Sequence, residues 1–442
     1  MLYSDFSNQQ FVDWFRHVSP YIHAHRGLTF VICFNGEAIN APHFNHLMHD
    51  IALLHSLGIR LVIVHGIRPQ IDHELSMRGL QPRYINNIRV TDEIALACVK
   101  AACGEVKTTI ESCLSMGLTN HPTIANPIRT VSGNFITARP IGVRDGVDYL
   151  YTGEIRRIDA LSIKQQLDSN HIVLISPLGY SPTGEAFNLL TADVASEIAI
   201  ALQATKWVYL TENPGIFNRE TQLVHNCVLT VSEAKVWLNY QGEATKKSQL
   251  ARIMRACEQG VHRVHLVDRK IEGALLLELF SREGIGIMVS ADPYENIREA
   301  TINDVGGLLE LIQPLEEQGV LVRRSREKLE MEISHFIVQE RDGTIVACVA
   351  LYPFPEEKMA ELACLVVHPQ YRREHRANTL LTFLEKKARQ LGIEQIFVLT
   401  TQTAHWFQER GFKPVSLSDL PVSRQGLYNF QRNSKLFIKS IT

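Results

Sequence analysis

The N-terminal two thirds of the chain alternates short, continuous apolar runs with segments whose apolar residues recur at helical spacing. A continuous apolar run of strand length is typical of a strand that is buried on both faces of a parallel sheet. The expected strands lie at residues 28–34, 59–66, 171–179, 206–215 and 261–268, and the expected helices at 10–26, 44–58, 192–204 and 273–284. The first helix should be interrupted at Pro20, because proline lacks a backbone N–H. This alternation predicts an α/β sandwich with helices on both faces of a parallel sheet.

The alternation of apolar runs and helical segments changes near residue 295, where we place a domain boundary. Thr301 and Asp304 predict a capping box that opens a helix through residue 312. Asp342-Gly343 lies between two alternating runs, which is a strong signal for a β-hairpin. A strand at 360–369, a basic turn, a helix, a strand at 394–401 and a short helix at 404–412 follow. We therefore expect two domains, a parallel-sheet sandwich over 1–294 and an α+β domain over 295–442.

Composition and charge narrow the class of protein. The net charge of -2 gives no global field that favours nucleic acid or an anionic membrane. The eight cysteines include no C-x-x-C pair, so neither a zinc ribbon nor a redox dithiol is indicated. The N-terminus lacks the features of a signal peptide, and no apolar run is long enough to span a bilayer. We expect a cytoplasmic protein with free thiols that acts on small molecules, with no nucleic-acid or membrane partner.

Three histidines recur every third residue at His43, His46 and His49 and would share one broad face of a helix. Imidazole is a common metal ligand, so this face is a candidate metal site. No carboxylate or cysteine in the pattern completes a ligand set, and a polar helix surface is the simpler interpretation. We therefore predict no metal.

The segment VVHPQYRREHRANTLL at 366–381 carries the strongest chemical signal. This segment and the order of elements around it resemble the GNAT acetyltransferases, whose coenzyme A loop reads Arg/Gln-x-x-Gly-x-Gly/Ala. Arg372, His375 and Ala377 stand at the fixed positions, with His375 in place of the first glycine. A strand that ends in a turn and opens a helix directs backbone N–H groups and the positive helix end at one spot, which suits a diphosphate.

The resemblance implies further contacts with acetyl-CoA, the expected co-substrate. Arg372, Arg373 and Arg376 would add charged donors to the diphosphate. Phe407, in the segment HWFQERGFKP, would pack near the pantetheine arm, form a core aromatic pair, or do both. The implied cofactor-binding residues are Leu365, Val366, Val367, Arg372, Arg373, His375, Arg376, Ala377, Asn378 and Phe407.

Acetyl transfer requires that an ammonium lose a proton and that the leaving thiolate receive a proton or a hydrogen-bond donor. Glu361 is the only acidic residue of its strand and is our candidate for the general base, on a face that continues through Leu365 and Val367. Its simpler interpretation is a solvated glutamate at the start of a strand. Thr400, at the end of the next strand, could offer a hydroxyl to the sulfur or could be satisfied by backbone groups.

Over its whole length the chain resembles the bacterial N-acetylglutamate synthases, in which an amino-acid kinase-like domain precedes a GNAT domain. The stretches that carry this resemblance lie at 21–32, 274–289 and 321–333. It implies transfer of acetyl from acetyl-CoA to the α-amine of L-glutamate, the first step of arginine biosynthesis. Glutamate has two carboxylates, which guanidinium groups bind in bidentate fashion. The family pattern assigns the glutamate site to Arg324, Cys364, Arg432 and Ser434.

The phosphate-binding motifs of the first domain are altered. Kinases that the domain resembles carry Lys-x-Gly-Gly after the first strand and Gly-Gly-Gly after the second, but this chain reads CFNGE at 33–37 and HGIRP at 65–69. Ile67 and Arg68 replace two glycines, and their side chains would block close approach of a phosphate. We therefore expect a kinase-inactive regulatory domain.

Arginine-sensitive members of the kinase family have an extra N-terminal helix with a tyrosine, and a site near the helix that matches residues 274–280. The resemblance thus implies feedback inhibition by L-arginine, bound at Tyr21, Glu278 and Gly284. It also implies a hexamer joined through N-terminal helices, whose apolar stripe here would be Phe11, Trp14, Phe15 and Val18. Alternatives are a true amino-acid kinase that carries an acetyltransferase, a non-catalytic arginine sensor and an acetyltransferase of protein lysines.

Overall fold

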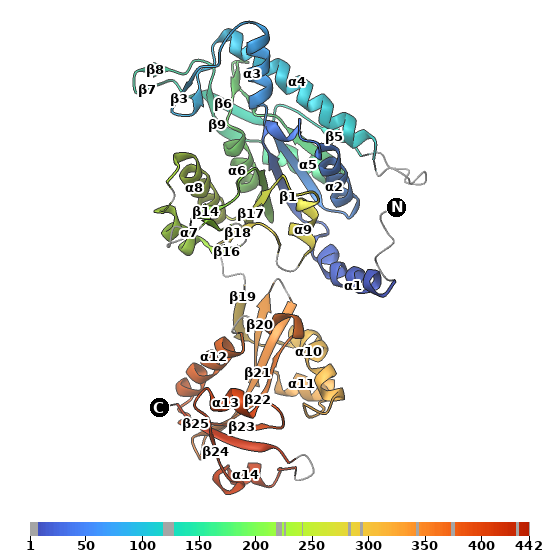
Figure 1. Ribbon diagram of the computed structural model, residues 1–442, viewed down its shortest axis with the longest axis vertical. Helices are drawn as coiled ribbons and strands as arrows, with labels where there is room; N and C mark the ends of the chain where they lie inside the picture. The colour runs from blue at the N-terminus through green and yellow to red at the C-terminus, as the bar shows by residue number, and fades with distance from the viewer. Residues whose placement is uncertain are drawn as a thin grey trace. The chain divides into compact units, whose positions relative to one another are not determined.

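The computed structural model describes residues 8–117, 128–217, 223–224, 227–240, 242–281, 284–291, 295–341, 344–372, 376–429 and 433–441. The chain forms two compact units, Met1–Pro293 and Tyr294–Thr442 (Figure 1). In the described part of the chain, no helix is both long and apolar enough to cross a membrane. The eight cysteines are free thiols.

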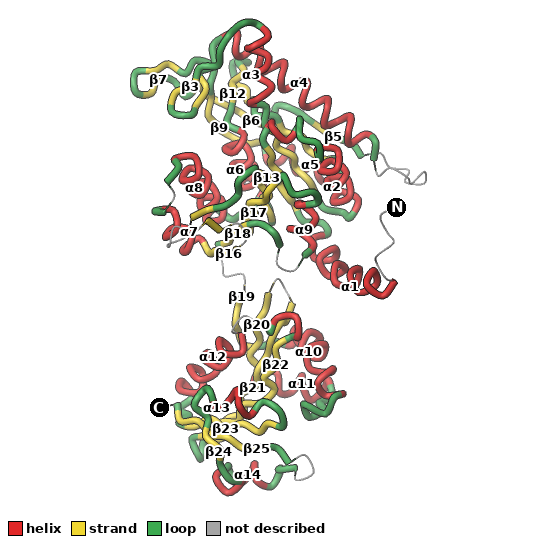
Figure 2. The backbone as a smooth tube through the Cα atoms, in the orientation of Figure 1, coloured by secondary structure: helices red, strands yellow, loops and turns green. Residues whose placement is uncertain are grey.

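An eight-stranded sheet forms the centre of the first unit (Figure 2). In spatial order its strands are β16 (Cys227–Thr230), β18 (Ile287–Ser290), β17 (Arg263–Asp268), β13 (Lys206–Thr211), β1 (Thr29–Phe34), β2 (Arg60–His65), β10 (Ile172–Ile175) and β5 (Thr130–Val131). Neighbouring strands are parallel except for the antiparallel pair β17 and β18. The five strands predicted from apolar runs are all present in this sheet.

Alternate residues of the sheet point into two separate cores. In β1, Val31 and Cys33 face one core, and Phe30 and Ile32 face the other. The first core is covered by α5 (Ala160–Asp168), α6 (Thr191–Leu202), α7 (Val231–Leu238) and α8 (Ala244–Glu258). The second is covered by α2 (Phe44–Ser56), α3 (Arg68–Met77), α4 (Glu93–Ser115) and α9 (Ala274–Phe280). Both faces of the strands are therefore buried, which explains why the runs are continuously apolar.

The N-terminal helix α1 (Asn8–His25) packs against α9. It continues through Pro20, so the predicted interruption is wrong. Proline removes one backbone donor from the helix, and the turns on both sides of Pro20 keep their helical conformation.

Smaller elements complete the first unit. A four-stranded sheet contains β12 (Ala186–Asn188), β11 (Leu178–Tyr180), β6 (Ile136–Pro140) and β9 (Gly153–Ile158). Two-stranded pairs are formed by β3 (Tyr84–Ile85) with β4 (Ile88–Arg89), β7 (Val143–Arg144) with β8 (Val147–Asp148), and β14 (Ile216–Phe217) with β15 (Leu223–Val224). The 3-10 helix η1 (Gly36–Ala38) follows β1.

A seven-stranded sheet forms the second unit. In spatial order its strands are β19 (Glu295–Glu299), β20 (Phe336–Arg341), β21 (Thr344–Phe354), β22 (Met359–Val367), β23 (Gln395–Thr400), β25 (Lys435–Ser440) and β24 (Lys413–Pro414). The helices are η2 (Ile302–Asp304), α10 (Val305–Glu317), α11 (Arg326–Glu332), η3 (Ile333–His335), η4 (Pro369–Tyr371), α12 (Arg376–Gln390), α13 (Ala404–Gln408), η5 (Leu417–Asp419) and α14 (Val422–Gln425). One face of the sheet packs against α10 and α11, and the other packs against α12.

Local signals in this unit predicted its elements well. The capping box is confirmed: the backbone N–H of Thr301 donates to Asp304 Oδ2 at 2.6 Å, and α10 follows directly. The strands of the predicted hairpin, β20 and β21, pair in antiparallel fashion. The turn residues Asp342 and Gly343 themselves lie outside the described residues.

Candidate active site

A β-bulge interrupts the central strand β22. Cys364 has a φ of 50°, in the left-handed region, and the register between β21 and β22 shifts beside it. A bulge adds one residue to a strand, so the side chains after it point to the opposite face from simple alternation. Tyr352, which pairs with Glu361, packs in the same core as Cys364, while Leu365 and Val367 pack beneath α12. Glu361 thus shares its face with Cys364, and the predicted face through Leu365 and Val367 is wrong.

Beyond its first half, β22 separates from β23. The parallel ladder joins residues 359–362 to residues 395–398, although β22 runs to Val367 and β23 to Thr400. Past Leu362 the described residues form no ladder between the two strands. On the edge of residues 363–367 that faces β23, the backbone N–H and C=O groups can therefore pair with an extended ligand that carries amides of its own.

Glu361 meets an arginine that the sequence did not single out. Arg424 of α14 donates through Nε to Glu361 Oε2 at 2.5 Å and through Nη2 to Oε1 at 3.0 Å. Only 18% of the Arg424 side chain and 12% of the Glu361 side chain are exposed. This bidentate pair fixes the orientation of the carboxylate, so Glu361 is not a solvated residue. No local pattern signals the pairing, because 63 residues separate the two.

Arg324 lies half-buried close to Cys364. Its backbone N–H donates to Glu316 Oε1 at 3.1 Å, which ties the segment before α11 to α10. Burial opposes the positive charge, but Cys364, Tyr352 and Glu332 together raise the pKa of Arg324. Burial also raises the pKa of the Cys364 thiol to about 11, so this thiol is neutral near pH 7 and lines the site without acting as a nucleophile.

Thr400 and Ser434 lie at the same end of the sheet, because Thr400 pairs with Lys435. Thr400 Oγ1 accepts from the backbone N–H of Thr403 at 3.1 Å and lies 2.9 Å from Thr403 Oγ1. The Thr400 oxygen therefore accepts hydrogen bonds within its own turn. This arrangement agrees with the second interpretation, in which backbone groups satisfy the hydroxyl. Ser434 is half-buried, and Arg432 lies outside the described residues.

The predicted coenzyme A turn joins β22 to α12 through η4. Arg372 is exposed, and its Nε donates to the Val367 carbonyl at 3.3 Å. Ala377 and Asn378 stand in the first turn of α12. Arg373 and His375 lie outside the described residues. An exposed guanidinium thus lies in the chain between the bulged strand and the start of α12, and both a guanidinium and a helix N-terminus favour binding of a diphosphate.

Arg376 does not point outward as expected. It is 4% exposed, and its Nε lies 3.0 Å from Oε2 of Glu295, on β19. Its Nη1 donates to the Tyr371 carbonyl at 3.0 Å, and Arg341 lies 3.4 Å from the same Glu295 carboxylate. The expected direct contact of Arg376 with a diphosphate does not fit this burial. Arg376 instead anchors the start of α12, and no local pattern identifies Glu295, which precedes it by 81 residues.

Phe407 forms the expected core aromatic pair. It is 3% exposed and packs edge-on against Trp406 and Phe412 beneath α12. Arg410 donates to Asn378 Oδ1 and lies 3.9 Å from the centre of the Trp406 ring. These contacts join α13 to the first turn of α12.

In the first unit, Glu278 lies in a buried cluster. Its Oε1 is 2.6 Å from His265 Nδ1, and its Oε2 accepts from the backbone N–H groups of residues 285–286 at 2.7 and 2.8 Å. Burial opposes the negative charge, but these hydrogen bonds lower the pKa of Glu278 overall. Gly284 has a φ of 62°, and a Cβ there would stand 2.7 Å from Glu278 Oε2. Tyr21 is half-buried on α1, which packs against α9, so the three predicted residues belong to one region.

The turns after β1 and β2 pack directly against each other. A Cβ at Gly66 would stand 2.6 Å from the backbone N of Gly36. Gln70 Nε2 donates to the Gly36 carbonyl at 2.9 Å, and Ile67 is 2% exposed. Side chains therefore fill the space beside the Gly36 backbone.

Comparison with known proteins identifies the family. Residues 29–268 match the model of the amino acid kinase family, and residues 307–412 match that of the acetyltransferase (GNAT) family. The amino-acid acetyltransferase of Azotobacter vinelandii is 51% identical over 98% of this chain and 100% of its own length. The chain belongs to the amino-acid acetyltransferases.

Solved structures agree with this membership. The N-acetylglutamate synthase from Neisseria gonorrhoeae, complexed with coenzyme A and L-arginine, matches with a TM-score of 0.88 at 38% identity over 97% of this chain and 99% of that one. The same enzyme complexed with coenzyme A and N-acetyl-glutamate matches with a TM-score of 0.61 at 39% identity, over 98% and 99%. The predicted fold, an amino-acid kinase domain followed by a GNAT domain, and the predicted acetyltransferase class are confirmed.

Proposed function

We propose that this acetyltransferase moves an acetyl group from acetyl-CoA to the α-amine of L-glutamate, giving N-acetyl-L-glutamate and coenzyme A. The observation that carries the proposal is the clustering of Glu361, Cys364 and Arg324 beside the half of β22 that is unpaired toward β23. A carboxylate-bearing amine and a thioester arm can meet there. The N. gonorrhoeae relative, complexed with coenzyme A and N-acetyl-glutamate, supports this pair of substrates.

The reaction needs two proton transfers at this strand. The glutamate ammonium gives a proton to Glu361, directly or through a water, and the neutral amine attacks the thioester carbonyl carbon. The tetrahedral intermediate collapses when the C–S bond breaks. The second proton of the attacking nitrogen passes to the departing sulfur, for which Thr400 is the hydrogen-bond donor, and Glu361 then releases the first proton to solvent. Arg424 acts as a positioning residue, because it holds the Glu361 carboxylate.

The two substrates would meet at the bulge of β22. Arg324 and Arg432 would bind the carboxylates of glutamate, with Cys364 and Ser434 lining the pocket. The cofactor would lie along the backbone of residues 365–367, with its diphosphate at the turn. The residues proposed for that turn are Arg372, Arg373, His375, Ala377 and Asn378.

The first unit supplies regulation in this proposal. Residues 1–294 form a kinase-inactive regulatory domain, and residues 295–442 form the catalytic domain. L-arginine inhibits by binding at Tyr21, Glu278 and Gly284, a role that the N. gonorrhoeae complex with L-arginine supports. The filled space beside Gly36 argues against the kinase alternative, and formation of an acylphosphate from ATP would revive it.

Copies of this cytoplasmic enzyme associate through α1, as a hexamer. Phe11, Trp14 and Phe15 are each 53% exposed, and an apolar group of this size favours association. Val18 is only 7% exposed, so it packs within the chain and does not extend the stripe as expected.

Thiol release from acetyl-CoA, measured with each amino acid in turn, tests the proposal. Glutamate alone should support release, and L-arginine should suppress it. Glu361→Gln should lower kcat by roughly 10²–10⁴-fold, the usual contribution of a general base. Arg324→Ala and Arg432→Ala should raise the KM for glutamate far more than the KM for acetyl-CoA. Equal release with other amino acids, or an equal rise in both KM values, would overturn the assignment to glutamate.

A further inference from the structure

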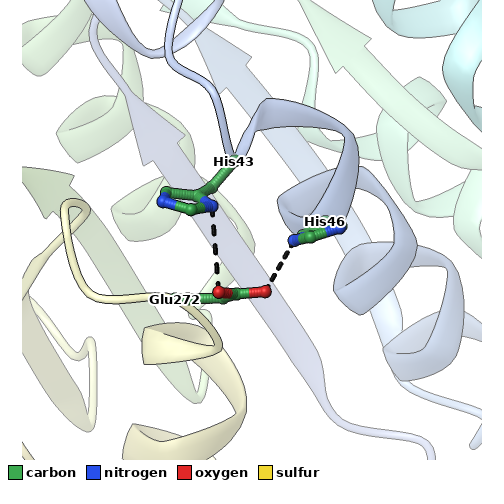
Figure 3. A group of neighbouring side chains, drawn as sticks. All are labelled: His43, His46 and Glu272. Carbon is green, nitrogen blue, oxygen red and sulfur yellow. Dashed lines mark ion pairs between the residues drawn. The ribbon is translucent and has the colours of Figure 1, made fainter. Parts of the chain in front are cut away.

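Two histidines and a glutamate meet on the surface of the first unit (Figure 3). His43 precedes α2, His46 lies in its first turn, and Glu272 lies in the turn between β17 and α9. His46 Nδ1 is 2.7 Å from Glu272 Oε1, and His43 Nδ1 is 3.9 Å from Glu272 Oε2. The two imidazole rings are stacked with their centroids 6.0 Å apart. The sequence pattern around the histidines offered no carboxylate to complete a ligand set, and the fold brings Glu272 into that position.

The distances suit a small tetrahedral cation. Zn²⁺ binds imidazole nitrogen and carboxylate oxygen at about 2.0–2.2 Å, so neighbouring ligand atoms lie roughly 3.3–3.5 Å apart. The separations of 2.7 and 3.9 Å lie on either side of this value. All three side chains are about half exposed or more, at 47%, 63% and 59% for His43, His46 and Glu272. Small rotations at the surface would equalise the distances.

The surrounding charges also favour a cation. Asp50, one helical turn after His46, interacts electrostatically with both His46 and Glu272, and burial raises the pKa of its carboxyl group to about 6, so it is ionised at pH 7 and above. The positive end of α2 acts in the other direction, but this effect is weak at exposed sites. A simple ion pair between His46 and Glu272 accounts for the shorter contact. His43 stacks on His46 and makes a second, longer ion-pair contact with the other oxygen of the same carboxylate, so both histidines converge on Glu272.

We propose that His43, His46 and Glu272 bind one divalent transition-metal ion, with Zn²⁺ as its occupant and water completing the coordination. Two imidazoles and a carboxylate favour zinc and its neighbours over Mg²⁺ and Ca²⁺, which take oxygen ligands. The ion joins α2 to the start of α9, two segments far apart in the sequence. It takes no part in acetyl transfer.

Equilibrium dialysis of the metal-free, full-length protein against Zn²⁺ tests the site. His46→Ala and Glu272→Gln should each weaken binding at this site tenfold or more. His49→Ala is the matched control, because His49 is an exposed histidine on the same helix outside the cluster; its affinity should stay within twofold of wild type. Because the ligands are exposed, the variants should keep the wild-type circular dichroism spectrum.

Co²⁺ provides a second readout that excludes the cysteines. A tetrahedral site of nitrogen and oxygen ligands should give visible absorption bands without the thiolate-to-metal bands of cysteine ligation. Equal zinc affinity in wild type and His46→Ala would overturn the proposal, and so would an equal loss in His49→Ala. Thiolate bands as the main Co²⁺ signal would also overturn it. Bound zinc should slow hydrogen exchange in Ala274–Phe280, and unchanged exchange there would overturn the link between α2 and α9.

Discussion

Replacing Glu295 by glutamine should loosen the start of α12, which follows the turn proposed for coenzyme A. The Glu295 carboxylate is bound by two buried arginines, Arg376 with 3% and Arg341 with 6% of its side chain exposed. The substitution keeps the shape of the side chain and one acceptor oxygen but removes its charge. Both guanidinium groups would then lack this partner in a site with little access to water.

The expected loss follows from this burial. Breaking a buried ion pair by removing one partner costs about 3–5 kcal/mol. Glu295 is itself 24% exposed, and glutamine retains an acceptor, so we expect about 3 kcal/mol, the lower end of that range. Each 1.4 kcal/mol is tenfold, so amides of α12 that exchange through local opening should exchange roughly 100-fold faster. The KM for acetyl-CoA should rise while the KM for glutamate stays nearly constant.

The chain provides a matched control on the same two elements. Glu299 of β19 pairs with Lys387 of α12 at 2.8 Å, but 64% of the Glu299 side chain is exposed. Glu299→Gln should therefore cost less than about 0.5 kcal/mol, as exposed ion pairs generally do. Hydrogen exchange of both variants, measured by mass spectrometry, checks the comparison. Equal acceleration in the two variants, or less than threefold in Glu295→Gln, would refute the reasoning.

Three further predictions concern stability. The hydrogen bond from Arg298 lowers the pKa of Asp304 to about 2 from its ordinary 3.8, so its stabilisation is complete above about pH 4 and is lost as the pH falls toward 2. In Asp304→Asn, the free energy of unfolding should fall by roughly 2 kcal/mol less than in wild type between pH 4 and pH 2. Denaturant unfolding at a series of pH values measures this difference. Gly66→Ala should destabilise the first unit by about 1–3 kcal/mol, because the new Cβ would stand 2.6 Å from the Gly36 backbone. Gly104→Ala, in an open position on α4, should raise thermal stability by up to about 1 kcal/mol.

Elements that depend on short-range signals could be predicted from the sequence. The apolar runs of the first unit became buried parallel strands, because a strand covered on both faces favours apolar residues at nearly every position. The Thr301–Asp304 capping box formed because both partners lie within one helical turn. The strand β22 and the helix α12, on either side of the turn proposed for coenzyme A, also followed from the local pattern.

Side-chain partners were decided by the tertiary structure alone. Arg424 reaches Glu361, Glu295 reaches Arg376, and Glu272 reaches His46 only after the order of strands and helices is set. No periodicity links such residues, because their separation along the chain carries no information about their distance in space.

The bulge at Cys364 shows how one residue changes a face. Simple alternation placed Leu365 and Val367 with Glu361, but the left-handed residue in β22 sends them to the opposite core. Sequence therefore determined which segments form the sheet and that α12 follows β22. The packing of the folded chain determined which side chains of β22 share a face with Glu361. Side chains along a strand alternate with a period of two, so a single inserted residue reverses the faces of all the residues after it.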